Sequence, residues 1–361
     1  MLDGKIRWRG LISSKPEVDK LVTDRIGAVV SLEESPVSVY LDDKYGKNRV
    51  NHPIPDPATA DLPEDIFYRA LTVAIPVMTR VLKEGGIVCV HCLGGTDRSP
   101  GLVAAFLRIR GTDGWVEEAE GIRLSQRMKE LVDYSVARYC TERLATDFLR
   151  EPHRFYSERS VHSQLFHYLS LAGMSKTVRT AAGYPMGTIQ QEYPPIKPDS
   201  GKTRRGLYDL VVFDQKTISS AAHWDHREDD GSRQGEPLSP LIAVEVGLDK
   251  GLSKDPVSAP SRLADFQKEL ARLANPSNKV RHGFLLYLYR YATFHREAVV
   301  SLLRHIREEA AATTKTSPNL DVIVAAAGYA EEAKFNVIES NTLRVRGGDA
   351  VQAEGPLLKS T

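Results

Sequence analysis

The stretch from residue 86 to residue 107 constrains the fold of this chain more than any other. The apolar run 86–90 favours a buried strand, and the run 101–107 favours a helix. Between them lies the sequence HCLGGTDRS, residues 91–99. A strand, a tight loop and a helix in this order direct backbone N–H groups toward an anion. The segment therefore predicts a parallel α/β domain with an anion-binding loop at the carboxyl end of a strand.

The residue types in this loop indicate phosphate chemistry. Cys92 is expected at a helix N-terminus beside a guanidinium, and both favour the nucleophilic thiolate. Arg98 offers a planar fork that can hold two phosphate oxygens, and Ser99 can donate a hydrogen bond to the sulfur. The curled backbone between them supplies the N–H groups expected to bind phosphate, those of Leu93, Gly94, Gly95, Thr96 and Asp97.

The pattern HC-x5-RS after a buried strand resembles the signature of the cysteine-dependent tyrosine and dual-specificity phosphatases, and the resemblance extends over roughly residues 1–145. It implies that Cys92 forms a phosphocysteine, that Arg98 binds the phosphoryl oxygens, and that no cofactor is needed. It also implies an aspartate on an upstream loop as general acid and then base. Asp56 is the best match in the proline-rich loop, and Asp61 is the alternative.

Less specific interpretations remain for two of these residues, and the substrate stays open. Cys92 could be a buried structural thiol, and Asp56 could be a turn residue between prolines. Asp97 departs from the most common protein-phosphatase pattern; an Asp-Arg pair also occurs in phosphatases of inositol lipids and in some secreted bacterial relatives. The expected partner is a phosphorylated protein, nucleotide, inositol phosphate or nucleic-acid end.

Composition limits the other function classes. With 361 residues and 42% hydrophobic residues, the chain can form two domains with real cores. Its net charge of +1 indicates no strong overall field for a nucleic acid or a membrane. No apolar run reaches the ~20 residues that span a bilayer, so no membrane partner is expected. The three cysteines favour a reducing compartment, and a cytoplasmic location is expected.

A second group of acids lies in the part of the chain expected to form a second domain, residues 150–342. Asp209 and Glu245 are embedded in the apolar strands predicted at 207–213 and 241–247, and Glu158 lies on the helix predicted at 155–171. Buried carboxylates are costly unless they are paired or bind a cation. The three acids could hold Mg²⁺ or Mn²⁺ through oxygen ligands and activate water for phosphodiester cleavage.

The order of helix, strand, strand, helix and strand around these acids resembles the PD-(D/E)xK nuclease superfamily. The resemblance implies a restriction-endonuclease-like α/β fold and DNA or RNA as a partner. The family expects a lysine two residues after the second acid, where Gly247 stands, so Lys250 and Lys268 are the candidates for that role. The alternative is a catalytically inactive module that binds nucleic acid or protein.

The predicted fold class is therefore α/β throughout. A parallel-sheet phosphatase domain over 1–149 precedes the α/β restriction-endonuclease-like domain, and residues 343–361 are expected to be a loose C-terminal tail. Within the first domain, the polar segment 33–51 is expected to hold a hairpin around 37–41.

Overall fold

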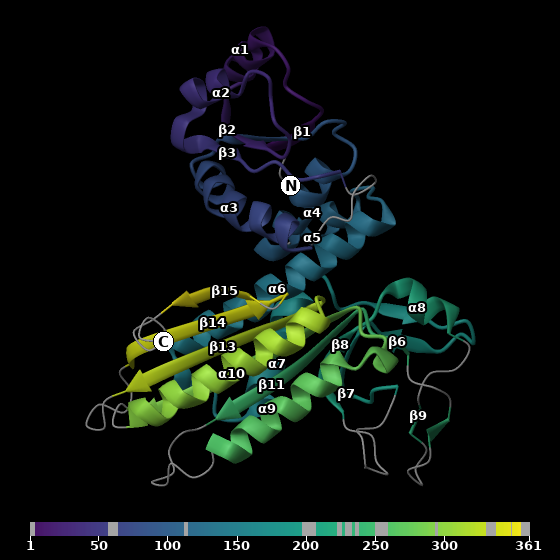
Figure 1. The fold of residues 1–361 in the computed structure, drawn as a ribbon. Helices are drawn as coiled ribbons and strands as arrows, with labels where there is room; N and C mark the ends of the chain where they lie inside the picture. The colour runs from purple at the N-terminus through teal and green to yellow at the C-terminus, as the bar shows by residue number, and fades with distance from the viewer. Residues whose placement is uncertain are drawn as a thin grey trace. The chain divides into compact units, whose positions relative to one another are not determined.

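The computed structural model divides the chain into two compact units (Figure 1). The first comprises residues 1–139 with 171–173, and the second comprises 140–170 with 174–361. The division falls inside helix α6 (Gln126–Arg150), which contributes residues to both. The structure describes residues 4–56, 64–111, 115–196, 207–221, 226–227, 233–234, 238–249, 259–292, 295–329, 337–347 and 349–354.

The first unit contains a four-stranded parallel sheet, which confirms the parallel α/β prediction. Its strands, in spatial order, are β1 (Ile6–Arg9), β4 (Ile87–His91), β2 (Ile26–Ser31) and β3 (Arg49–Asn51). The helices that accompany them are α1 (Lys15–Thr23), α2 (Ser38–Tyr45), α3 (Glu64–Lys83), α4 (Arg98–Arg110) and α5 (Trp115–Glu120), with a 3-10 turn at Gly46–Asn48.

Strand β4 lies in the interior of this sheet, between β1 and β2. Its residues after Ile87 are buried, as expected of an apolar strand covered on both faces. Helix α3 follows the helical spacing read from the sequence, with Leu71, Ala74 and Met78 on its buried side. The strand that precedes the HCLGGTDRS loop is therefore held on both sides, which fixes where the loop begins.

The prediction of a hairpin around 37–41 is wrong, because this segment forms helix α2. Leu41 and Tyr45 lie four residues apart and both join the core cluster of Val29 and Cys89. That spacing places them on one helical face. Burial of this face on the sheet outweighs the strand preference of the β-branched Val37 and Val39.

The second unit contains a seven-stranded mixed sheet. Its spatial order is β15 (Asp349–Glu354), β14 (Val337–Arg346), β13 (Leu320–Tyr329), β12 (His282–Ala292), β11 (Ile242–Asp249), β8 (Tyr208–Val212) and β7 (Ile189–Tyr193). The central strands β11, β12 and β13 run parallel, and the remaining neighbours pair antiparallel. Other elements are α7 (Glu158–Leu171), α8 (Gln215–Ser220), α9 (Ala259–Ala274), α10 (Arg296–Thr316), the 3-10 turns Pro152–Arg154 and Pro276–Asn278, and the short strands β5 (Thr177–Arg179), β6 (Pro185–Gly187), β9 (His226–Arg227) and β10 (Arg233–Gln234).

Helices α9 and α10 lie side by side over one face of this sheet (Figure 1). Their apolar stripes supply Phe266, Leu270 and Leu302 to the core cluster, which the sheet completes with Leu285 and Val322. The order α7, β8, β11, α9, β12 is the one expected from the sequence. Strand β7 precedes β8 and was not predicted, since its segment carries mixed residues with few apolar side chains.

The expectation of a loose tail from residue 343 is wrong for 343–346 and 349–354, which belong to β14 and β15. Leu343 and Val345 alternate into the core cluster, while their neighbours on β14 face outward. Antiparallel pairing with β13 satisfies the backbone of this strand. A strand with few apolar residues is stable here because the sheet edge is already formed. Residues 355–361 lie outside the described part of the chain.

Among the helices that the structure describes, none combines the length and apolar character needed to cross a membrane.

Candidate functional site

The loop between β4 and α4 wraps around the sulfur of Cys92. The backbone N–H of Gly95 donates to the Cys92 Sγ at 3.2 Å, and the Ser99 Oγ lies 3.2 Å from the same sulfur. Cys92 is 2% exposed, at the end of a parallel strand and directly before a helix. The structure thus brings together Cys92, Ser99 and a loop N–H, as the sequence predicted.

Arg98 is buried and fixed from two directions. Its Nη1 lies 2.7 Å from Glu33 Oε2 and 2.6 Å from the backbone oxygen of Ile54. Arg98 is the first residue of helix α4, directly after the loop that carries Cys92. The pairing of Arg98 with Glu33 was missed from the sequence. The sequence did contain a signal for this proximity. Glu33 follows β2, Arg98 follows β4, and the carboxyl ends of these parallel strands meet at one sheet edge.

Gly95 is the position where the loop backbone requires a glycine. Its φ is +70°, and a Cβ built there would lie 2.6 Å from the backbone carbon of Arg9 and the nitrogen of Gly10. The same strand end is hydrogen-bonded to the loop, because the Cys92 N–H donates to the Arg9 oxygen at 3.3 Å. The end of β1 therefore supports the turn that aims the Gly95 N–H at the sulfur.

Asp97 does not point toward the sulfur but holds a neighbouring segment. Its carboxylate accepts hydrogen bonds from the Ser125 backbone N–H at 3.1 Å and from the Ser125 Oγ at 2.6 Å. Ser125 precedes helix α6. Leu93, by contrast, is 56% exposed at the start of the loop. Of the five loop residues expected to bind phosphate, Gly95 is the one whose N–H is shown to contact the Cys92 sulfur, and the phosphate-binding role of all five stays a prediction.

Two buried groups lie behind the loop. The His91 ring is fully buried, with its Nε2 2.7 Å from the Ser31 Oγ, and burial lowers the pKa of His91 to about 4. Burial raises the pKa of the Cys89 thiol to about 11. A neutral His91 braces β4 against β2, and Cys89 stays protonated at neutral pH. Neither group competes with Cys92 as a nucleophile.

Asp56 is partly buried and follows the segment that contacts Arg98. The Ile54 oxygen accepts from Arg98, and the Ile54 N–H donates to the Leu32 oxygen at 3.2 Å. This tie holds the start of the proline-rich loop beside the guanidinium, with Asp56 two residues further on. Asp61 lies outside the described residues. The role of Asp56 as general acid stays a prediction.

In the second unit, the three predicted acids gather around strand β11. The Asp209 Oδ2 accepts from the Val246 N–H at 2.6 Å, and the Glu158 Oε1 accepts from the Leu248 N–H at 3.5 Å. Burial raises the pKa of Glu245 well above its ordinary value, and the charge of Asp209 raises it further. The structure therefore brings Glu158, Asp209 and Glu245 into one neighbourhood, as the sequence predicted.

An arginine that the sequence analysis did not single out pairs with one of these acids. The Arg272 Nη1 lies 2.6 Å from the Glu245 Oε1 and donates to the Leu207 oxygen at 2.7 Å. Both side chains are almost fully buried, with exposures of 6% and 2%. Glu269, also on α9, is a fourth acid; burial and the charge of Asp209 raise its pKa to about 7. Arg272 was missed because it lies beside Leu270 and Leu273 on an amphipathic helix.

The donor set does not fit a metal ion as it is arranged. Within the described ranges, no group of three or more His, Cys, Asp or Glu side chains is placed to hold one. Gly247 cannot be replaced by the lysine that the family expects, because a Cβ there would lie 2.4 Å from the Tyr287 ring. Lys268 is exposed on α9, and Lys250 lies outside the described residues.

No family model matches the sequence, and no curated protein matches it. Several solved structures that are similar to part of the chain are phosphatases. Tk-PTP in its active form is 25% identical, with a TM-score of 0.29 over 37% of this chain and 91% of its own. PTPMT1 is 20% identical, with a TM-score of 0.30 over 39% and 95%. The PTP-2 phosphatase of Cydia pomonella is 17% identical, with a TM-score of 0.28 over 35% and 83%. Because these scores are low, the functional assignment rests on the geometry of the loop.

Proposed function

We propose that the first unit hydrolyses phosphate monoesters through a phosphocysteine at Cys92. The observation that carries the proposal is the placement of its Sγ, 3.2 Å from the Gly95 N–H and from the Ser99 Oγ at the end of a parallel strand. Arg98 directly follows the same loop, and its guanidinium is paired with Glu33. A buried structural thiol needs none of these groups, so the arrangement favours catalysis over packing.

Each step of the proposed reaction has a residue that can perform it. The Cys92 thiolate attacks phosphorus while the bond to the leaving oxygen breaks, and Asp56 protonates that oxygen. Arg98 holds two of the phosphoryl oxygens, and the loop N–H groups stabilise the charge that develops on them. Water then attacks the phosphocysteine as Asp56 takes its proton. The phosphorus–sulfur bond breaks, and Ser99 donates to the departing thiolate.

The test is hydrolysis of a generic aryl phosphate by the full chain. Cys92→Ser should abolish turnover, because an alkoxide is not available at neutral pH. Cys89→Ala is the matched control, since it removes a buried thiol from the same strand but not from the loop, and it should retain activity. Turnover by Cys92→Ser at the wild-type rate would overturn the proposal.

The general acid is tested separately from the nucleophile. Asp56→Asn should slow release of a poor leaving group more than release of a good one, because only the former needs protonation. An equal loss with both leaving groups would exclude Asp56 as the acid. Activity toward a phosphotyrosine peptide, an inositol phosphate and a 5′-phosphorylated oligonucleotide would then define the substrate class.

For the second unit, we propose a fold of the nuclease type that serves as a binding module for nucleic acid or protein rather than as a catalyst. The pairing of Arg272 with Glu245 supports this choice, because one of the three acids that would bind a cation is already paired with an arginine. The full chain should not cleave DNA or RNA in Mg²⁺ or Mn²⁺. Metal-dependent cleavage that is lost in Asp209→Ala would contradict the proposal of a binding module and would favour an active nuclease.

A further inference from the structure

Asp97 departs from the usual behaviour of an acid at the start of a helix. It directly precedes α4, where an aspartate side chain normally accepts a hydrogen bond from the first turn of its own helix. Among the described residues, its side chain makes no such bond. Both carboxylate oxygens are engaged by Ser125, 28 residues further along the chain, whose backbone N–H donates to Oδ1 at 3.1 Å and whose hydroxyl donates to Oδ2 at 2.6 Å. The side chain therefore links two elements rather than capping one.

Ser125 is itself held by α6, the helix that it precedes. Its Oγ accepts a hydrogen bond from the Met128 N–H at 3.2 Å, and its backbone oxygen accepts from the Lys129 N–H at 3.0 Å. A serine in this position is an N-cap, which satisfies one of the free N–H groups of the first helical turn. Asp97 is therefore tied to the capped start of a helix of 25 residues.

The first turns of α4 and α6 are also packed together by an apolar contact. Met128 is buried, and a Cβ built on Gly101 would lie 2.5 Å from its Sδ. The Gly101 N–H donates to the Asp97 backbone oxygen at 2.8 Å. One backbone turn at the start of α4 thus carries both the apolar contact with Met128 and the polar contact with Ser125. A shift of Asp97 is therefore opposed by α6 at two points.

Asp97 lies between two groups that the proposed reaction needs in fixed positions. Gly95, two residues before it, donates to the Cys92 sulfur, and Arg98 is the next residue. The contacts of the Arg98 side chain hold its guanidinium, whereas the carboxylate of Asp97 holds the chain directly before it.

We propose that Asp97 is a positioning residue for phosphoryl transfer, because its contact with Ser125 fixes the loop backbone between Gly95 and Arg98. The inference rests on the proposed phosphatase function and assigns the carboxylate no contact with substrate. A carboxylate suits this task because it accepts from both donors of one serine at once, and hydrogen bonds to a charged acceptor are the stronger kind. A displacement of about 1 Å at a reacting group costs about 100-fold in rate, so a small shift of this segment is enough to lower turnover.

Two other roles of the contact make different predictions. A purely structural role predicts a lower melting temperature after substitution and an unchanged kcat of the folded protein. A role of the negative charge itself, such as proton transfer, predicts that Asp97→Asn loses as much activity as Asp97→Ala. The positioning role predicts that asparagine restores activity, because its Oδ1 can accept from the Ser125 N–H and its Nδ2 can donate to the Ser125 Oγ.

The experiment measures kcat for an aryl phosphate and the melting temperature, both on the full chain. Asp97→Ala should lower kcat about tenfold or more at a temperature at which the variant stays folded. Asp97→Asn should keep kcat within about threefold of the wild-type value, since both contacts with Ser125 remain available.

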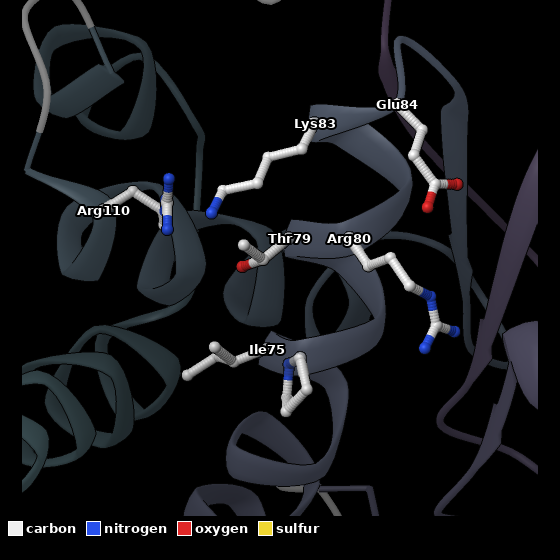
Figure 2. Close-up of a pocket in the computed structure, with 7 residues that line it drawn as sticks. Ile75, Thr79, Arg80, Lys83, Glu84 and Arg110 are labelled. Carbon is white, nitrogen blue, oxygen red and sulfur yellow. The ribbon is translucent and has the colours of Figure 1, made fainter.

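Glu84→Ala is the matched control, because it removes one exposed carboxylate from the same unit and should leave kcat at the wild-type value. Figure 2 shows Glu84 beside a hollow that Arg110, the last residue of α4, also lines. Arg98 begins this helix of 13 residues. At about 1.5 Å per residue, the two ends of α4 are about 18 Å apart, so the control lies far from the loop around Cys92.

Ser125→Ala breaks the same contact from the other side and carries the test if Asp97→Ala does not fold. It removes the 2.6 Å bond and should lower kcat about fivefold or more. The combined variant, Asp97→Ala with Ser125→Ala, should be no slower than Asp97→Ala alone. Two residues that act through one contact do not lose activity independently.

The outcomes separate this inference from the proposed function. A wild-type chain that hydrolyses no aryl phosphate overturns the proposed function and, with it, the inference. If the wild type is active, a wild-type kcat in Asp97→Ala overturns the inference alone, whatever the melting temperature. Equal losses in Asp97→Asn and Asp97→Ala, or losses that multiply in the combined variant, also overturn it.

Discussion

Gly95→Ala should damage both the stability and the activity of the first unit, because the new methyl group has no space. At φ +70° an alanine costs about 1 kcal/mol relative to glycine. The Cβ would also lie 2.6 Å from backbone atoms of Arg9 and Gly10, which are not flexible side-chain ends. Overpacking of this kind costs about 1–3 kcal/mol. Together these effects predict a loss of about 2–4 kcal/mol in the free energy of unfolding.

The loop can also relieve this strain by moving, which would cost activity instead. A displacement of about 1 Å lowers turnover about 100-fold when reacting groups must be aligned. The assay therefore measures urea unfolding and kcat/KM for an aryl phosphate on the same protein. Gly94→Ala is the control, because its Cβ would meet only the Thr96 Oγ1, at 3.4 Å. If Gly95→Ala behaved like Gly94→Ala in both measurements, the assigned backbone geometry would be refuted.

Three further predictions concern charged or titratable side chains. Glu33→Gln should lower kcat/KM about tenfold without loss of folding, because Arg98 loses its 2.7 Å partner; an unchanged rate would show that Glu33 does not position it. Arg272→Met should cost about 3–5 kcal/mol in urea unfolding by leaving Glu245 buried and unpaired, and adding Glu245→Gln should restore part of it. Burial lowers the pKa of His91 from 6.5 to about 4, so the unfolded chain binds a proton that the folded chain does not. Stability should be fully present above pH 6.5 and should fall by up to about 3 kcal/mol as the pH drops to 4, and His91→Gln should flatten that profile.

The loop around Cys92 was predictable because its signals are local. An apolar run, a cysteine, two glycines and an arginine lie within fifteen residues of sequence, and strand, loop and helix follow from that order alone. The partner of Arg98 was not predictable in the same way. Glu33 reaches it only because Val30 and Ser31 of β2 pair with Val90 and His91 of β4, a register that chain order does not specify.

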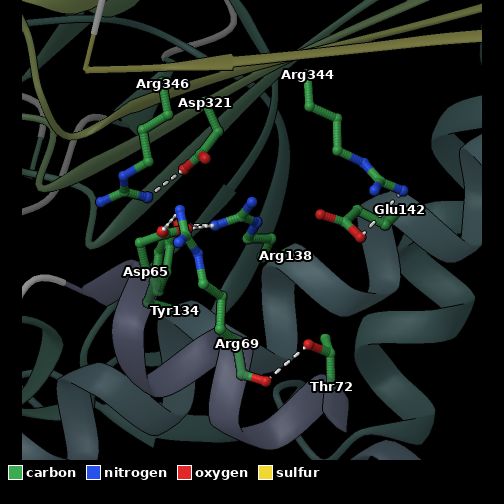
Figure 3. Close-up of polar contacts among 9 residues, drawn as sticks. All are labelled: Asp65, Arg69, Thr72, Tyr134, Arg138, Glu142, Asp321, Arg344 and Arg346. Atoms are coloured by element: carbon green, nitrogen blue, oxygen red, sulfur yellow. Dashed lines mark hydrogen bonds and ion pairs between the residues drawn. The ribbon is translucent and has the colours of Figure 1, made fainter. Parts of the chain in front are cut away.

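In the second unit, too, contacts between distant segments could not be predicted from the sequence. The acids at 158, 209 and 245 were recognised because carboxylates in apolar segments are unusual. Arg272 was not, because a single cation on an amphipathic helix looks like a residue of the solvent-exposed face until the packing of α9 is known. Strands β14 and β15 were missed since a strand at the end of a formed sheet needs little hydrophobic sequence of its own. Figure 3 shows that Arg344 and Arg346 on β14 pair with Glu142 and Asp321.

Another ion pair of Figure 3 belongs to the first unit, where the Arg138 Nη1 lies 2.8 Å from the Asp65 Oδ1. Asp65 is in the first turn of α3, directly after the segment 57–63 that the structure does not describe. The pair holds the first turn of α3, and the Ile54 contacts hold the described chain before residue 57.

The burial of Cys89 has a consequence for how the proposed phosphatase would recover from oxidation. A sulfenic acid at Cys92 is protected within a protein when a second thiolate attacks it to form a disulfide, or when a backbone nitrogen attacks it to form a sulfenamide. Cys89 stays protonated and packs into the core with Ile12 and Val18, so it cannot serve as that resolving thiol. Reactivation would then depend on a small thiol or a reductase reaching Cys92 from outside.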